Sequence, residues 1–282
     1  MLVWWVRDHQ KWGLPLVAAD FNEAIYQQKM ASHWEKKDRF TKEHCMRINW
    51  DACEGAMRCL KLPWQNWIVK HAEGMCGVGK WLQIWKDRDT DACPPCSAPE
   101  DAWHVWKCPD HWAQAICTKG LHNISTWMET AQTDPEIQSA IITHLTQCLN
   151  SQPPTPLPET SPHVQAVIDI QNDIGWENFF EGCMAKEWEH IQIIYYEWCW
   201  SKKSGCRWTT ALIQKLWDVA WDLWEYRNGI IHSNENAEIL HNIDLTFLRR
   251  KIGIKSHTEQ RDTRKIYTHG FPMYVYMYLT SM

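Results

Sequence analysis

The segment from Arg207 to Asn228, RWTTALIQKLWDVAWDLWEYRN, constrains the fold more than any other part of the chain. Large apolar side chains recur along it at helical spacing and form one stripe, made of Trp208, Leu212, Leu216, Val219, Leu223 and Tyr226. A second stripe lies beside the first and is made of Trp217, Trp221 and Trp224. A helix that is apolar over more than half of its circumference has to be packed on several sides. We therefore expect a core helix surrounded by other helices, rather than an aromatic platform on which nucleic-acid bases stack.

Other segments carry helix signals of their own. The chain has 21 tryptophans and only 12 glycines, which favours helices with large apolar faces over turn-rich sheets. Asp134 followed by Pro135 is typical of a helix start. Further helical periodicity is found in residues 21–38, 48–60 and 63–74, and from about Val164 to Trp200. The sequence predicts a mainly α fold, a multi-helix bundle, with a strand expected only in the tail segment YVYMYL.

A proline-rich connector divides the sequence into two helical halves. Residues 151–162, SQPPTPLPETSP, hold five prolines and cannot form a helix. We expect an N-terminal helical region at residues 1–150, a tryptophan-rich C-terminal helical region at residues 163–268, and a tail at residues 269–282.

The stretch CPPCSAPEDAWHVWKC, residues 93–108, has the residue types of a zinc knuckle. Such a site needs a tight turn with two thiolates, followed by a short helix that delivers two more ligands. Cys93 and Cys96 bracket a Pro-Pro turn. The chain has 12 cysteines, and the apolar stretch at its start is too short for a signal peptide. In a reducing compartment these cysteines are expected to be buried thiols or metal ligands.

The second half of the knuckle is predicted to be a short helix. Ser97 and Glu100 have the spacing of a capping box, which would start a helix there. In that helix His104 and Cys108 would lie on one face, four residues apart, and Pro109 would end it.

The knuckle pattern predicts one structural Zn²⁺ bound by four side chains, Cys93, Cys96, His104 and Cys108. His111 is an alternative ligand, three residues after Cys108. The simplest competing interpretation is a pair of core thiols and a surface histidine.

The knuckle and the residues around it also carry a family resemblance. CPPCSAPEDAWHVWKCP is similar to the zinc-binding segment near the C-terminus of reverse transcriptases encoded by non-LTR retrotransposons. Residues 48–96 resemble the segment that leads into that knuckle in retroelement-derived reading frames of unicellular eukaryotes, and residues 174–196 and 207–232 resemble the helical segments that follow. The resemblance covers about residues 20–232. It implies the same four ligands and an all-helical accessory region.

Nothing in the sequence predicts an enzyme. Polymerases hold two metal ions on adjacent aspartates, and the chain contains no Asp-Asp pair. GMCGVGKW, residues 74–81, fits most of a phosphate-binding loop, but Trp81 stands where a hydroxyl is required and the preceding residues are helical in pattern. Two pairs of carboxylates stand four residues apart, Asp169 with Asp173 and Asp218 with Asp222. Solvated helix faces explain these pairs more simply than a metal site does.

The charge distribution allows only a local contact with phosphates. The formal net charge is −5, and residues 151–235 carry 6 basic and 12 acidic side chains. Residues 249–265, RRKIGIKSHTEQRDTRK, hold seven basic side chains. The candidate nucleic-acid contacts in this cluster are Arg249, Arg250, Lys251 and Lys255. An ordinary solvated helix is the alternative interpretation of this segment.

Taken together, these features predict a non-catalytic accessory module of a reverse-transcriptase-like protein. It would help to hold template RNA or target DNA, with weak and salt-dependent affinity, beside an upstream reverse-transcriptase domain. The alternatives are an interaction scaffold that binds no nucleic acid, which the net charge of −5 favours, and a non-functional relic of a retroelement. No run of 18 apolar residues occurs, so we expect no membrane contact and an intracellular location, in the nucleus or cytoplasm.

Overall fold

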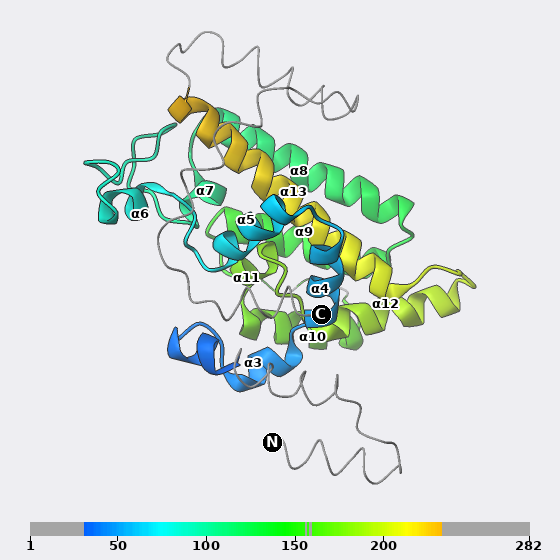
Figure 1. Cartoon of the computed structure of the whole chain (residues 1–282). Helices are drawn as coiled ribbons and strands as arrows, with labels where there is room; N and C mark the ends of the chain where they lie inside the picture. The colour runs from blue at the N-terminus through cyan, green and yellow to red at the C-terminus, as the bar shows by residue number, and fades with distance from the viewer. Residues whose placement is uncertain (1–30, 156, 158–159, 233–282) are drawn as a thin grey trace. The chain divides into compact units, whose positions relative to one another are not determined.

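The regular structure of the chain is helical throughout the part that we describe, which is residues 31–155, 157 and 160–232 of a computed structural model (Figure 1). Within these residues β pairing is limited to isolated bridges, such as the one between Ala92 and Pro99, and no strand is formed. The predicted mainly α fold is confirmed. The helices are α3 (Lys42–Arg47), α4 (Trp50–Arg58), α5 (Leu62–Ala72), α6 (Gly79–Ile84), α7 (His104–Lys107), α8 (His111–Thr130), α9 (Pro135–Leu149), α10 (Pro162–Ile174), α11 (Trp176–Phe180), α12 (Lys186–Trp198) and α13 (Gly205–His232).

The described residues divide into two compact units, one that contains residues 31–48 and one that begins at Asn49. Residues 31–48 are the described part of the first unit. There the Thr41 hydroxyl accepts a hydrogen bond from the His44 N–H and the His44 ring accepts one from the Thr41 N–H, which caps the start of α3.

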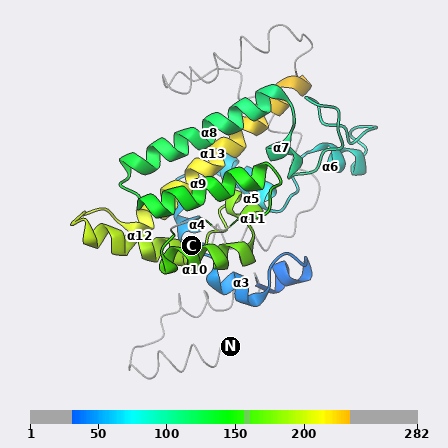
Figure 2. The ribbon, with the colours of Figure 1, turned by 180° about the vertical axis from the view of Figure 1, so that it is seen from behind.

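Helix α13 is the central element of the second unit. It packs against α8 and α4, and also against α12, α7 and α11 (Figures 1 and 2). Every member of its predicted first stripe, from Trp208 to Tyr226, is buried. The prediction of a core helix packed on several sides is therefore confirmed.

The second stripe of α13 packs on α5 through aromatic rings. Trp221 stacks on Trp64 with ring centroids 4.5 Å apart and meets Trp67 edge-on at 4.9 Å. Trp224 lies 6.4 Å from Trp67, while Trp217 is buried and donates a hydrogen bond to the Glu181 carbonyl. These indoles hold two helices together and are half-buried or buried, which accounts for the abundance of tryptophan in this region.

The described residues of the proline-rich connector before Pro162, where α10 begins, are not helical, as predicted, and they link helices of one unit. Gln147 of α9 donates a hydrogen bond to the Thr155 hydroxyl, and Glu136 at the start of α9 accepts one from the Ser161 N–H. Both ends of the connector are thus held against α9. Helices from before and after it pack on each other, since α9 contacts α10 and α11 and α8 contacts α13.

Two parts of the helical pattern differ from the sequence prediction. The stretch from Val164 to Trp200 is three helices, because Gly175 and Gly182 adopt φ angles of 96° and 97° that interrupt it. The long helix α8 was not predicted at all, because Gly120 and many polar residues dilute its pattern. Its signals were the Asp110 N-cap and a buried series at helical spacing, made of Ala113, Cys117, Leu121, Ile124 and Met128.

Several predictions concern residues outside the described part of the chain. These are the first ten residues of the helix expected at residues 21–38, the basic cluster at residues 249–265 and the strand expected at YVYMYL. Among the helices that are described, none combines the length and the apolar character that a membrane crossing requires.

The close approach of α8 to α13 predicts that Gly→Ala substitutions at Gly120 and Gly229 have opposite effects on the free energy of unfolding. A β-carbon on Gly120 would lie 2.5 Å from Cγ2 of Val219, whereas a β-carbon on Gly229 would meet no atom within 4 Å. Both Gly→Ala changes gain similar helix propensity, about 1 kcal/mol. We therefore expect Gly120→Ala to be less stable than Gly229→Ala by about 1–3 kcal/mol, because only the first is overpacked. Urea unfolding followed by circular dichroism measures this difference, and equal stabilities would contradict the packing of α8 on α13.

Candidate metal centre

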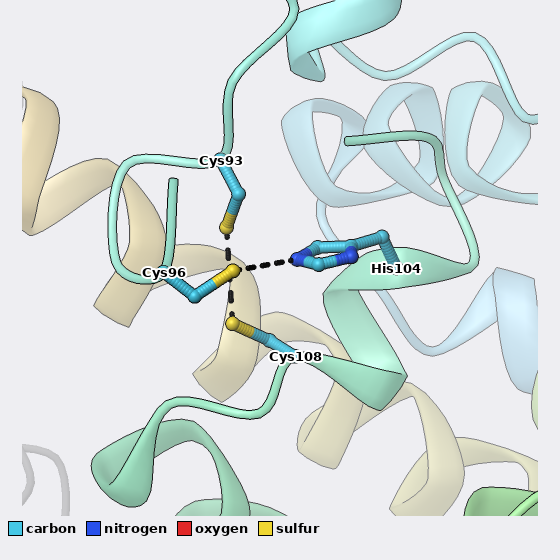
Figure 3. A group of neighbouring side chains, drawn as sticks. All are labelled: Cys93, Cys96, His104 and Cys108. Atoms are coloured by element: carbon cyan, nitrogen blue, oxygen red, sulfur yellow. Dashed lines mark hydrogen bonds between the residues drawn. The ribbon is translucent and has the colours of Figure 1, made fainter. Parts of the chain in front are cut away.

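Four side chains from the 93–108 segment converge on one point (Figure 3). Cys93 and Cys96 come from a turn, and His104 and Cys108 come from the beginning and end of α7. One ligand atom from each residue lies within 4.8 Å of the others. In the part of the chain that the structure describes, this is the cluster of His, Cys, Asp or Glu side chains that can hold a metal ion.

Backbone hydrogen bonds shape the turn that carries the first two cysteines. The Cys93 N–H donates to the Ala98 carbonyl at 2.7 Å, and the Ser97 N–H donates to the Cys93 carbonyl at 2.8 Å. Ser97 has a φ of 62°, which closes the turn in the left-handed region. The turn therefore points both sulfur atoms to the same side (Figure 3).

The other two side chains come from a shorter helix than the sequence predicted. α7 begins at His104, and the Asp101 carboxylate accepts a hydrogen bond from the His104 N–H at 2.7 Å. The predicted capping box is wrong, because Ser97 belongs to the turn and the Glu100 side chain is directed elsewhere. The predicted helix end is confirmed, since Cys108 leaves the helix with a ψ of 124° immediately before Pro109.

The spacing of the four atoms fits a tetrahedral metal ion. Sγ of Cys93 lies 3.7 Å from Sγ of Cys108, and Sγ of Cys96 lies 3.2 Å from Nε2 of His104. Metal–sulfur bonds of about 2.3 Å and metal–nitrogen bonds of about 2.0 Å give tetrahedral edges of about 3.8 Å and 3.5 Å. The cluster therefore has the dimensions needed to hold one ion.

Hydrogen bonds within the cluster favour a thiolate at Cys108. The hydrogen bond with Cys93 lowers the pKa of Cys108 to about 4, and the same contact raises the pKa of Cys93. The hydrogen bond to Cys108 also raises the pKa of His104. A thiolate is the form in which cysteine binds metal ions, so Cys108 is the thiol of the cluster that reaches this form most readily.

A buried ion pair anchors the knuckle to the rest of the unit. The Glu100 carboxylate accepts hydrogen bonds from Nε and Nη2 of Arg227, at 2.8 and 2.6 Å. The two side chains are 0% and 4% exposed. The same carboxylate accepts the Gly79 N–H at 2.6 Å, and the Glu100 carbonyl accepts the Lys80 N–H at 2.9 Å. One residue of the knuckle thus binds both α13 and the start of α6.

This pair also explains the glycine-rich stretch at residues 74–81. Helix α5 precedes it, as the sequence predicted, and a phosphate-binding loop instead follows a strand. The Gly79 N–H, which such a loop would offer to a phosphate, is already bound to the Glu100 carboxylate. The stretch therefore serves to dock α6 on the knuckle.

Aromatic and polar contacts fix the helix side of the cluster. Trp106 of α7 is buried and lies 4.4 Å, between ring centroids, from Phe180 of α11. Just beyond Cys108, the Asp110 carboxylate caps α8 and accepts a hydrogen bond from the Tyr226 hydroxyl at 2.6 Å. The ends of the knuckle are thus held by α11 on one side and by α13 on the other.

The structure brings together the four predicted ligands and separates them from the alternative. His111 is exposed at the first position of α8 and does not belong to the cluster. Neither aspartate pair, at 169 and 173 or at 218 and 222, joins a metal-binding group in the described residues. Arg249, Arg250, Lys251 and Lys255 lie outside the described residues.

The Glu100–Arg227 pair was missed by the sequence reasoning, although one signal was present. Arg227 stands four residues after Leu223, so it continues the apolar stripe of α13. A charged side chain on such a stripe needs a buried partner. The stripe alone does not identify Glu100 as that partner, since 127 residues separate the two.

Comparisons of the chain with protein-family models, with curated proteins and with solved structures find no match. The relation to reverse transcriptases therefore stays a prediction that rests on the resemblance.

The buried ion pair predicts a non-additive pair of substitutions. Arg227→Met leaves a buried carboxylate without its cation, and we expect the free energy of unfolding to fall by about 3–5 kcal/mol. Adding Glu100→Gln removes the uncompensated charge and keeps an acceptor for the Gly79 N–H, so the double variant should be more stable than Arg227→Met alone. Urea unfolding of the two single variants and the double variant measures the coupling. Simple addition of the two losses would show that the pair is not coupled.

Proposed function

We propose that Cys93, Cys96, His104 and Cys108 bind one zinc ion. Three thiolates and an imidazole in tetrahedral arrangement are a ligand set that zinc prefers. The cluster dimensions and the thiolate favoured at Cys108 support this choice.

The role of this zinc ion would be structural. All four positions of the tetrahedron are taken by protein side chains, whereas catalytic zinc sites keep one position for water or substrate. The ion would join the turn at Cys93 to α7. Because Glu100 lies between these two halves, zinc would also hold its carboxylate in place for Arg227.

A matched pair of cysteine variants tests the zinc site. We expect one zinc ion per purified chain, well below one for Cys96→Ser, and one for Cys206→Ser, because Cys206 is exposed on α13 outside the cluster. Elemental analysis with protein quantification gives the ratio. Equal zinc content in the two variants would contradict the ligand assignment.

For the chain as a whole we propose a non-catalytic accessory module of a retrotransposon-derived, reverse-transcriptase-like protein, which helps to bind template RNA or target DNA. The observation that carries this proposal is the closed Cys₃His cluster, which falls in the segment with the strongest resemblance to such proteins. The helices that follow the knuckle in the resemblance correspond to α11 with α12 and to α13; α13 packs on α11, on α12 and on α7 of the knuckle. Polymerase chemistry would then belong to a separate domain, since the chain lacks an Asp-Asp pair.

An interaction scaffold is the second candidate. The observation that favours it is the formal net charge of −5, which opposes association with a polyanion. This candidate predicts no affinity for RNA even at low salt.

Salt dependence tests the nucleic-acid proposal. We expect weak, nearly sequence-independent binding of RNA by the zinc-loaded chain, falling steeply between about 50 and 200 mM salt as counterions return to the phosphates. Alanine at Arg249, Arg250, Lys251 and Lys255 should reduce the slope by about one unit for each phosphate that is no longer neutralised. Lys61→Ala, at an exposed lysine before α5, is the control and should leave the slope nearly unchanged. Absence of binding at low salt would replace this proposal by the scaffold.

A further inference from the structure

Two tryptophans at the end of α12 are exposed to solvent. Trp198 is 76% exposed and Trp200 is 93% exposed, while most tryptophans of the described residues are buried or half-buried. Ile194, one turn before Trp198, is 52% exposed, and the Tyr195 ring lies 6.0 Å from the Trp198 ring. Large apolar side chains exposed at neighbouring positions add little to the burial that stabilises the fold, and an exposed apolar patch is a candidate binding surface.

The backbone at Trp200 strengthens this interpretation. The Ser201 N–H donates to the Tyr196 carbonyl and the Trp200 N–H donates to the Glu197 carbonyl, which is the hydrogen-bond pattern of a Schellman motif. Trp200 occupies the left-handed position of that motif, with a φ of 53°. Glycine is the usual residue there, because a side chain strains the backbone. Trp200 therefore combines a strained backbone with an almost fully exposed side chain, a combination that does not stabilise the fold.

The exposed indoles stand on a rigid base. On the opposite face of α12 the Tyr196 hydroxyl donates to the Ala131 carbonyl at 2.7 Å, and the Gln192 side chain bonds the backbone of Gln132 and Asp134. After the helix, the Ser201 hydroxyl donates to the Gln132 side chain. The connection from α12 to α13 lies at one edge of the unit in both views (Figures 1 and 2), so the indoles are accessible while their backbone is held.

Basic side chains follow the indoles directly. Lys202, Lys203 and Arg207 are exposed, and Lys203 Nζ also donates to the Thr130 carbonyl. They are three of the six basic residues between positions 151 and 235, where 12 acidic residues make the surroundings negative. Between Tyr195 and Arg207 Glu197 is the single acidic residue. Along the sequence, positive charge therefore follows the exposed rings directly.

We propose that this surface, formed by Trp198, Trp200, Lys202, Lys203 and Arg207, binds single-stranded nucleic acid. Unpaired bases stack on the two indoles, and the three cations contact the phosphates. A duplex keeps its bases stacked inside and cannot offer them to the rings, so single strands are preferred. This proposal rests on the proposed nucleic-acid function and assigns a second contact site to it, within the described residues.

The neighbouring charges favour a polyanion over an apolar protein partner. Interfaces between proteins place aromatic residues in a core that is depleted of lysine. Here two consecutive lysines and an arginine lie within seven residues of Trp200. Aromatic rings next to basic side chains are instead the combination found in grooves that bind single strands.

Fluorescence anisotropy with the zinc-loaded full chain tests the proposal, at about 50 mM salt. The probes are a labelled oligouridylate of about 12 nucleotides and a duplex of the same length. We expect the oligouridylate to bind more tightly than the duplex. Trp198→Ala and Trp200→Ala should each weaken its binding by about tenfold. Lys202→Gln with Lys203→Gln should lower the slope of log affinity against log salt by about one to two units.

Two further variants separate binding from folding. Trp200→Gly removes the indole and relieves the strained backbone, so it should raise the unfolding temperature while it weakens binding of the oligouridylate. Trp112→Ala, at a tryptophan on α8 that is 46% exposed, is the matched control and should bind as tightly as the unmodified chain.

The outcomes distinguish this proposal from the one on which it rests. If the unmodified chain binds the oligouridylate and the Trp198 and Trp200 variants bind equally well, this surface is not the site and the nucleic-acid function stands. If the unmodified chain binds the duplex but no oligouridylate, this proposal alone is overturned, and if it binds neither probe, both proposals are overturned. Trp-dependent binding to vesicles of anionic phospholipid, with no binding of either probe, would overturn both and make the surface a membrane contact.

Discussion

The Glu100 carboxylate and the Arg227 guanidinium form a buried ion pair where the knuckle, α6 and α13 meet. Glu100 accepts two hydrogen bonds from Arg227 and one from the Gly79 N–H, so its charge is fully compensated. A buried pair of this kind adds little stability over an apolar contact, but every arrangement that separates the partners is costly. It therefore selects one position of the knuckle along α13.

Aromatic packing supports this arrangement over a larger area. Trp64 of α5 stacks on Trp221 of α13, Trp67 of α5 lies tilted beside Trp224, and the Arg227 guanidinium lies 4.9 Å over the Trp224 ring. From α5 the contacts continue to Trp106 of α7 and then to Phe180 of α11. The knuckle is thus built into the helical core. In this it differs from small zinc fingers, whose folding depends on the metal alone.

The metal cluster and the ion pair support each other through their shared segment. Cys93 and Cys96 precede Glu100, and His104 and Cys108 follow it, so the proposed zinc ion closes a loop around the buried carboxylate. A closed loop has less conformational freedom, so Glu100 loses less conformational entropy when it pairs with Arg227. The exposed surface of Trp198 and Trp200 lies outside this network, where a strained and accessible side chain does not disturb the core.

Local sequence determined the features that depend on near neighbours. Helical spacing identified α13 and its buried stripe, Asp134 marked the start of α9, and Pro109 marked the end of α7, because these signals act within a few residues. The spacing of three cysteines and a histidine also predicted which side chains converge. Only the tertiary structure decided what Glu100 does. Its distance from Ser97 suggested a helix cap, but its partner Arg227 is 127 residues away, and burying the pair satisfies both charges. Long-range partners of this kind are set by how helices pack, which no local pattern encodes.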